Sequence, residues 1–213
     1  MKDFFGSFFC YNAVVTTSTK LRFALPYILI VTSMIGMLAS VILIYDQVQI
    51  WQNPSYVAPC SLNPVLSCGS VINSKQGHIL GIPAPFFGLV MFPALYTFGI
   101  VVASGVKLKK WLWLGLQAAV TGGVAFALWL FWISLYKIHG LCPYCLLTDA
   151  AVYTMAWYVT LYNIEQGYLF TAKKITPVTS FVRKHHLDIL ISVFLFIAAF
   201  ILHHFWYYYG RHI

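Results

Sequence analysis

Charged side chains are scarce in this sequence of 213 residues. The chain has 13 Lys and Arg and five Asp and Glu, so that only 8% of its residues are charged, while 61% are hydrophobic and 18% are aromatic. Soluble domains carry about 25% charged residues, and this chain has too few to hydrate a soluble surface. Intrinsic disorder is excluded as well, because disordered chains are poor in aromatic residues and rich in charge. The composition therefore predicts an integral membrane protein.

Five apolar stretches are each long enough to cross a hydrocarbon core of about 30 Å, which takes roughly 20 helical residues. They cover residues 21–45, 82–106, 111–136, 142–163 and 187–209. Strands are excluded, because the stretches lack the alternating pattern of a membrane barrel. Small residues four positions apart, such as Gly36 and Ser40, let helices approach closely in lipid, and the fifth stretch has few small residues. We predict an all-α integral membrane fold, with a four-helix transmembrane bundle and a fifth, peripheral transmembrane helix.

The basic residues lie unevenly on the two sides of these spans, with ten on one side and three on the other. Cytoplasmic loops are enriched in Lys and Arg, so we expect an inner (cytoplasmic) membrane protein with a cytoplasmic N-terminus. The chain then divides into a cytoplasmic segment, a four-helix bundle with a long outer loop, a cytoplasmic loop, and a fifth helix with a short outer tail. These parts cover residues 1–20, 21–164 (outer loop 46–81), 165–186 and 187–213.

Two cysteine pairs fall on the predicted outer side, which is the oxidising side of such a membrane. Cys142 and Cys145 form a Cys-Pro-Tyr-Cys motif at the start of the fourth span. Proline is favoured in the first turn of a helix, which places Cys142 at the helix N-terminus, where a thiolate is stabilised. A structural bridge across two residues would add little stability. A metal site is not expected, because zinc needs four ligands and the loop offers no second motif. We therefore interpret this pair as redox-active.

The other pair, Cys60 and Cys68, lies in the outer loop. Alone, such a pair would be interpreted as a structural staple, but a second pair nearby makes thiol–disulfide exchange between them possible. Asp149 shares a helix face with Cys145 and is an ionisable residue within a span, which indicates a functional site or an acid near the helix end. Thr148 could hydrogen-bond an electron acceptor, or bond back to its own helix.

In these elements the sequence resembles the vitamin K epoxide reductase family, in its bacterial branch. The resemblance covers roughly residues 21–163 and rests on the loop cysteines with the Gly-Ser-Val-Ile-Asn-Ser run 69–74, the Gly-Ile-Pro run 81–83, Gly88 and the Cys-Pro-Tyr-Cys motif. It implies a bundle that encloses a quinone (ubiquinone or menaquinone), with Cys145 nearest the ring. It also implies that Ser74 and Phe87 lie near the quinone. Vertebrate members have tyrosine in place of Asp149, so the reduction of vitamin K epoxide is not implied.

These features predict a membrane thiol:quinone oxidoreductase that supports disulfide bond formation outside the cytoplasm. The chain ends four residues after the fifth span, so we expect a separate soluble thioredoxin-fold thiol oxidase to reduce the Cys60–Cys68 disulfide on the outer face. By family analogy, Cys60 would then attack Cys142, and the freed Cys145 would reduce the quinone. One alternative is an enzyme like disulfide bond formation protein B, in which the two motifs have the reverse order. Another is a transporter or channel subunit with purely structural disulfides.

Overall fold

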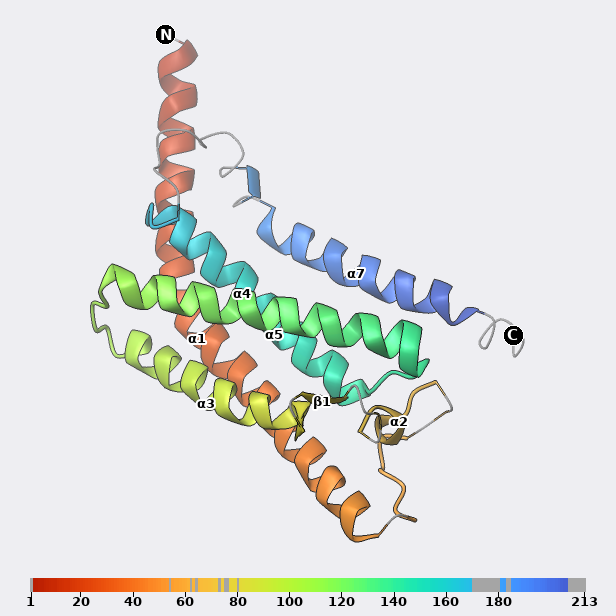
Figure 1. Cartoon of the computed structure of the whole chain (residues 1–213). Coiled ribbons are helices and arrows are strands. Elements are labelled where there is room, and N and C mark those ends of the chain that lie inside the picture. The colour runs from red at the N-terminus through yellow and green to blue at the C-terminus, as the bar shows by residue number, and fades with distance from the viewer. Residues whose placement is uncertain are drawn as a thin grey trace.

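The computed structural model is almost entirely helical (Figure 1). It describes residues 2–53, 55–61, 63, 65–72, 74, 77–79, 81–169, 181–182 and 185–206, with the backbone alone for 2–20 and 78–79. Its elements in chain order are α1 (Lys2–Gln52), α2 (Cys68–Ile72), β1 (His78–Ile79), β2 (Ile82–Pro83), α3 (Ala84–Ala103), α4 (Lys110–Ile133), the π-helix η2 (Ser134–Ile138), α5 (Pro143–Glu165) and α7 (His186–His204). The two short strands pair antiparallel just before α3. The predicted all-α fold is confirmed.

Within the described part of the chain, four helices are long and apolar enough to cross a membrane. They are Leu21–Gln52, Ala84–Ala103, Lys110–Ile138 and His186–His204. The helix predicted over residues 142–163 is present as α5, and its 23 residues are sufficient in length. It is less apolar than the other four, because it carries Asp149 and three threonines. Since α5 packs against α1 and α4, these polar residues lie on a helix that is largely enclosed by protein.

Helix α1 extends seven residues beyond the predicted end of the first span at residue 45, as far as Gln52. The extension begins with two polar residues, Asp46 and Gln47. In the structure both side chains are only 2% exposed. The extension therefore brings two buried polar groups to the end of the bundle at which α5 begins.

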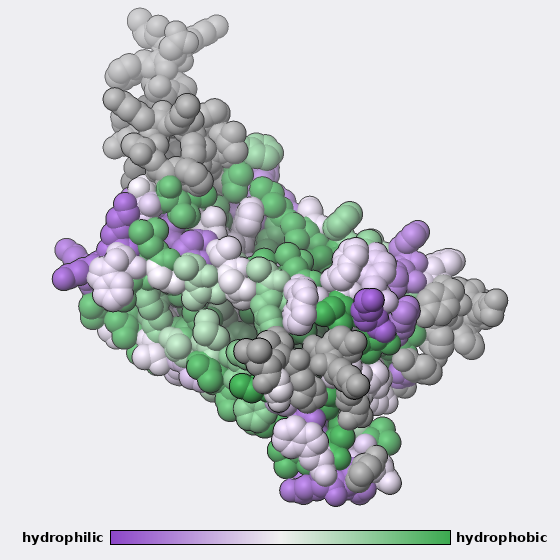
Figure 2. All heavy atoms as spheres, in the orientation of Figure 1, coloured by the Kyte–Doolittle hydropathy of each residue, from purple (hydrophilic) through white to green (hydrophobic). Residues whose placement is uncertain are grey.

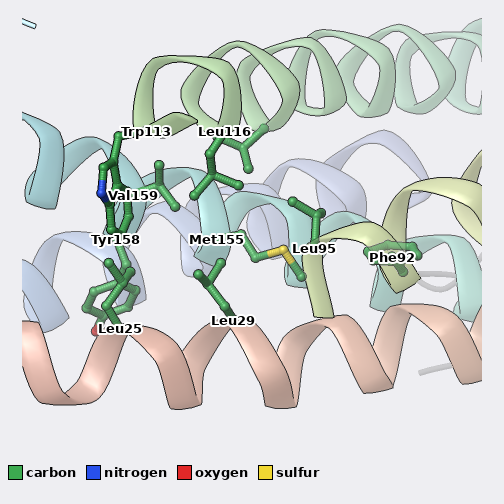
Figure 3. Packing of buried hydrophobic residues seen from close by; sticks show 10 residues of the cluster. Leu25, Leu29, Phe92, Leu95, Trp113, Leu116, Met155, Tyr158 and Val159 are labelled. Atoms are coloured by element: carbon green, nitrogen blue, oxygen red, sulfur yellow. The ribbon is translucent and has the colours of Figure 1, made fainter. Parts of the chain in front are cut away.

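The core lies where α1, α3, α4 and α5 meet (Figure 3). Met155 of α5 points toward Leu29 of α1 and Leu95 of α3, and Trp113 and Leu116 of α4 cover the opposite side of α5 (Figure 3). Burying side chains of this size contributes about 1.5–3 kcal/mol each on water-based scales, and in lipid the same close packing supplies the dispersion contacts that hold helices together. The core thus fixes α1 against α5, which positions the polar end of the bundle.

Small residues allow α1 and α3 to approach closely, as the sequence predicts. A side chain added at Gly36 of α1 would meet the ring of Phe92 on α3, and one added at Gly88 of α3 would meet the Ser40 hydroxyl on α1. By contrast, Gly122 of α4 has open space where its side chain would be. Gly123, the next residue of α4, does lie close to Val152 of α5, so close contacts occur between α1 and α3 and between α4 and α5.

Helix α7 lies beside the bundle rather than within it (Figure 1), in agreement with the predicted peripheral fifth helix. None of its own residues is buried. Its end is held by the His204 imidazole, which lies 3.1 Å from the carbonyl oxygen of Leu135. Figure 2 shows a mainly hydrophobic face over the helices, with hydrophilic residues gathered toward the ends. Exposed side chains such as Val90 and Phe196, each 72% exposed, give the chain a surface suited to lipid.

Candidate active site

The four cysteines outside α1 lie together at the end of the bundle where α5 begins. Cys60 and Cys68 form a disulfide with a Cα–Cα distance of 5.7 Å, while Cys142 and Cys145 are free thiols. The sulfur of Cys142 lies 3.1 Å from the sulfur of Cys68. Two pairs that are far apart in the sequence are thus in direct contact. This contact permits thiol–disulfide exchange, in which a thiolate attacks a disulfide sulfur.

Backbone hydrogen bonds tie the loop to the chain just before α5. The Leu141 N–H donates to the Val65 carbonyl at 2.7 Å, and the Ser67 N–H donates to the Leu141 carbonyl at 2.9 Å. These bonds form a short parallel bridge between Leu66 and Leu141. Cys68 lies two residues after Leu66, and Cys142 directly follows Leu141. The bridge therefore holds Cys68 against Cys142 through the backbone.

The local structure of the Cys-Pro-Tyr-Cys motif is as predicted. Cys142 is the N-cap of α5 and Pro143 is the first helical residue. The Cys145 N–H points at the Cys142 sulfur, 3.4 Å away. This is the position at which a helix stabilises negative charge, so the arrangement favours Cys142 as a nucleophile or leaving group.

The sulfur nearest to Cys142 differs from the one expected by family analogy. The expectation was that Cys60 attacks Cys142, but the structure places Cys68 there, because α2 begins at Cys68 and packs against the start of α5. The Cys60 sulfur instead lies 3.8 Å from a carboxylate oxygen of Asp46. Cys60 is 7% exposed, whereas Cys68 is completely buried. In the structure Cys68, rather than Cys60, is therefore the loop cysteine in contact with Cys142, and Cys60 is the more accessible of the two.

A cavity of about 170 Å³ adjoins the free thiols. It lies between α1, α3, α4 and α5, and both Cys142 and Cys145 line it. Most of the other lining side chains are apolar, among them Phe87 and Phe126, whose ring centroids are 6.0 Å apart. An apolar cavity of about 150 Å³ can hold a benzene ring. The residues present therefore fit a quinone ring beside the thiols.

The predicted cofactor residues have different positions relative to this cavity. Phe87, Thr148 and Asp149 line it. The Thr148 hydroxyl donates to the Cys145 carbonyl at 2.8 Å, which is the bond back to its own helix that the sequence left open. Ser74 does not line the cavity: its hydroxyl donates to a backbone carbonyl in α2 at 2.7 Å and accepts from the Gly77 N–H at 3.0 Å. Ser74 therefore shapes a turn, and Gly77 in that turn lines the cavity.

Two buried polar residues of α1 were missed by the sequence analysis. Asp46 accepts a hydrogen bond of 3.0 Å from the Tyr56 hydroxyl, and Gln47 lines the cavity. Partial burial, together with the hydrogen bond and the charge of Asp46, raises the pKa of Tyr56. In the sequence these two residues directly follow the apolar stretch. The apolar residues Ile50 and Trp51 after them were the available sign that the helix continues past Asp46 and Gln47.

Among the described residues, no group of three or more His, Cys, Asp or Glu could hold a metal ion.

Residues 27–160 match the vitamin K epoxide reductase family. The match covers more than half of the chain and includes all four clustered cysteines, the cavity and helices α3 and α4. No curated protein matches the chain.

Proposed function

The chain belongs to the vitamin K epoxide reductase family, and from this premise we propose that it carries electrons from a thiol protein outside the cytoplasm to a membrane quinone. Members of this family are oxidoreductases that reduce quinones using thiols, and this chain is a multi-pass membrane protein of that kind. The single observation that carries the proposal is the 3.1 Å contact between the Cys68 and Cys142 sulfurs, made at the edge of a cavity that Cys145 also lines.

The proposed relay begins at the loop pair. A thiolate of the partner attacks Cys60, the more exposed sulfur of the disulfide, and Cys68 leaves as the thiolate. The second thiol of the partner then resolves the mixed disulfide. The partner has now lost two electrons, and Cys60 and Cys68 are both thiols.

The second exchange moves these electrons to the helix pair. The Cys68 thiolate attacks Cys142 in a Cys142–Cys145 disulfide, and Cys145 leaves as the thiolate. Cys60 then attacks Cys68, which restores the loop disulfide and releases Cys142. The resulting state, with an oxidised loop pair and two free thiols on α5, is the one that the structure contains.

The last step oxidises the helix pair again. A bound quinone supplies an acceptor for two electrons and two protons. Cys145, which lines the cavity, would be the thiol that gives up the electrons, and the Cys142 sulfur would then bond to the Cys145 sulfur to close the disulfide. Phe87 and Asp149 line the cavity, and Thr148 and Ser74 support its wall through their hydrogen bonds to the backbone. The enclosing helices exclude water from the reacting sulfurs.

The partner is a separate soluble thioredoxin-fold thiol oxidase, and the acceptor is ubiquinone or menaquinone. The excess of basic residues on one side supports an inner-membrane location with the N-terminus in the cytoplasm and both cysteine pairs on the outer, periplasmic side. In this arrangement the protein supports disulfide bond formation outside the cytoplasm.

The proposal is tested by following quinol formation by the purified protein in detergent, with dithiothreitol as the reductant and a short-chain ubiquinone as the acceptor. The wild type is expected to turn over, and Cys145→Ala is expected to lose turnover because the quinone-facing thiol is gone. A Cys10→Ala variant serves as the matched control and should turn over like the wild type. Full turnover by Cys145→Ala would contradict the relay.

A further inference from the structure

Gln47 carries a buried carboxamide that borders the cavity. Its side chain is 2% exposed on α1 and lines the cavity, and among the described residues none forms a hydrogen bond with it. A glutamine side chain offers two N–H donors and a carbonyl acceptor. Because an unsatisfied buried polar group is unfavourable, the position of Gln47 indicates a partner that occupies the cavity.

The other polar groups at the cavity supply different chemistry. The hydroxyls of Ser40 and Thr148 already donate to carbonyls of their own helices, each at 2.8 Å, and the third lining hydroxyl, that of Ser134, carries an O–H but no N–H group. Asp149 lies on α5, and its carboxyl group carries no N–H donor in either protonation state. Among the described residues that line the cavity, no side chain other than Gln47 carries an N–H group. Gln47 is therefore the N–H donor best placed to meet a ligand with an exposed carbonyl oxygen.

We propose that Gln47 hydrogen-bonds a ring oxygen of the quinone and sets the affinity of the site for it. This inference rests on the proposed function and adds the residue that recognises the ligand. The amide N–H donates to the carbonyl oxygen of the oxidised quinone, and the amide carbonyl accepts from the hydroxyl of the quinol. One side chain can thus serve both redox forms without changing its own protonation state, which a carboxylate or an ammonium group cannot do.

The test compares Gln47→Leu and Gln47→Met with a matched change elsewhere on α1. Ser33 is completely buried, its hydroxyl has no hydrogen-bond partner in the part of the chain that the structure describes, and it does not line the cavity. Ser33→Ala therefore also removes an unpartnered buried polar group. Each variant is assayed in detergent for the KM of a short-chain ubiquinone, the KM of dithiothreitol, and the Tm with and without the quinone.

We expect both Gln47 variants to raise the KM of the quinone about fivefold to tenfold, which is the loss of one uncharged hydrogen bond. The KM of dithiothreitol should change less than about twofold. The Tm without quinone should be equal to or above that of the wild type, because an unpaired polar group is replaced by an apolar one, and the rise in Tm caused by quinone should shrink. Ser33→Ala should leave the KM of the quinone unchanged.

The outcomes separate this inference from the proposed function. If the wild type reduces the quinone and both Gln47 variants keep its KM and its Tm shift, the role of Gln47 is wrong while the proposed function stands. If the variants lose stability without quinone and both KM values rise together, Gln47 is structural and the inference is also overturned. If the wild type itself does not reduce the quinone, the proposed function is wrong, and the inference, which rests on it, is wrong as well.

Discussion

The contact between Cys68 and Cys142 predicts which two sulfurs will cross-link when their usual partners are removed. In a Cys10→Ala background, Cys60→Ser with Cys145→Ser leaves Cys68 and Cys142 as the remaining thiols. Their sulfurs are 3.1 Å apart, and a disulfide bond measures about 2.05 Å. An approach of about 1 Å is therefore enough, and we expect this variant to oxidise almost completely to the Cys68–Cys142 disulfide.

The matched variant exchanges the roles of the two loop cysteines. Cys68→Ser with Cys145→Ser leaves Cys60 and Cys142, and the Cys60 sulfur faces Asp46 instead of Cys142. A misplacement of about 1 Å can slow an intramolecular reaction about a hundredfold, so we expect this pair to cross-link at least about a hundredfold more slowly.

Both rates can be measured after removal of dithiothreitol, by alkylating the remaining thiols at intervals and counting the added groups by mass spectrometry. Equal rates, or faster cross-linking through Cys60, would refute the assignment of Cys68 as the sulfur that exchanges with Cys142.

Two further predictions concern packing and the cavity wall. Gly36→Val should lower the free energy of unfolding by about 1–3 kcal/mol, because the new side chain meets Phe92. Gly122→Val should have little effect, because that position faces open space. Thermal unfolding in detergent measures both variants. Thr148→Val should change the KM of the quinone less than about threefold, since the hydroxyl is bonded to the Cys145 carbonyl, and a tenfold rise in the steady-state assay would show that it binds the ligand instead.

Much of this arrangement follows from local sequence patterns. Long apolar stretches must form helices in lipid, because every backbone polar group has to be satisfied within the segment. The proline of the Cys-Pro-Tyr-Cys motif sets the start of α5, and so the position of Cys142 at the helix N-terminus could be predicted from four residues. The peripheral place of α7 could be predicted because it has few small residues.

The rest depends on contacts between segments that the sequence does not pair. Whether Cys60 or Cys68 meets Cys142 is decided by the bridge between Leu66 and Leu141, and nothing in the loop sequence distinguishes the two cysteines. Gln47 follows an apolar stretch, where a polar residue normally indicates the membrane surface. Only the packing of α1 against the other helices shows that its side chain is buried at the cavity.

The most direct test of the central claim is the quinol yield of a single turnover. The protein is fully reduced, freed of reductant, and mixed with excess short-chain ubiquinone without oxygen. Four clustered thiols form two disulfides, so the wild type should yield about two quinols per chain. Cys68→Ala, in which only the α5 pair can react, should yield about one, and Cys145→Ala should yield none. Two quinols from Cys68→Ala, or any quinol from Cys145→Ala, would contradict a relay that runs from the loop pair through Cys142 and Cys145 to the quinone.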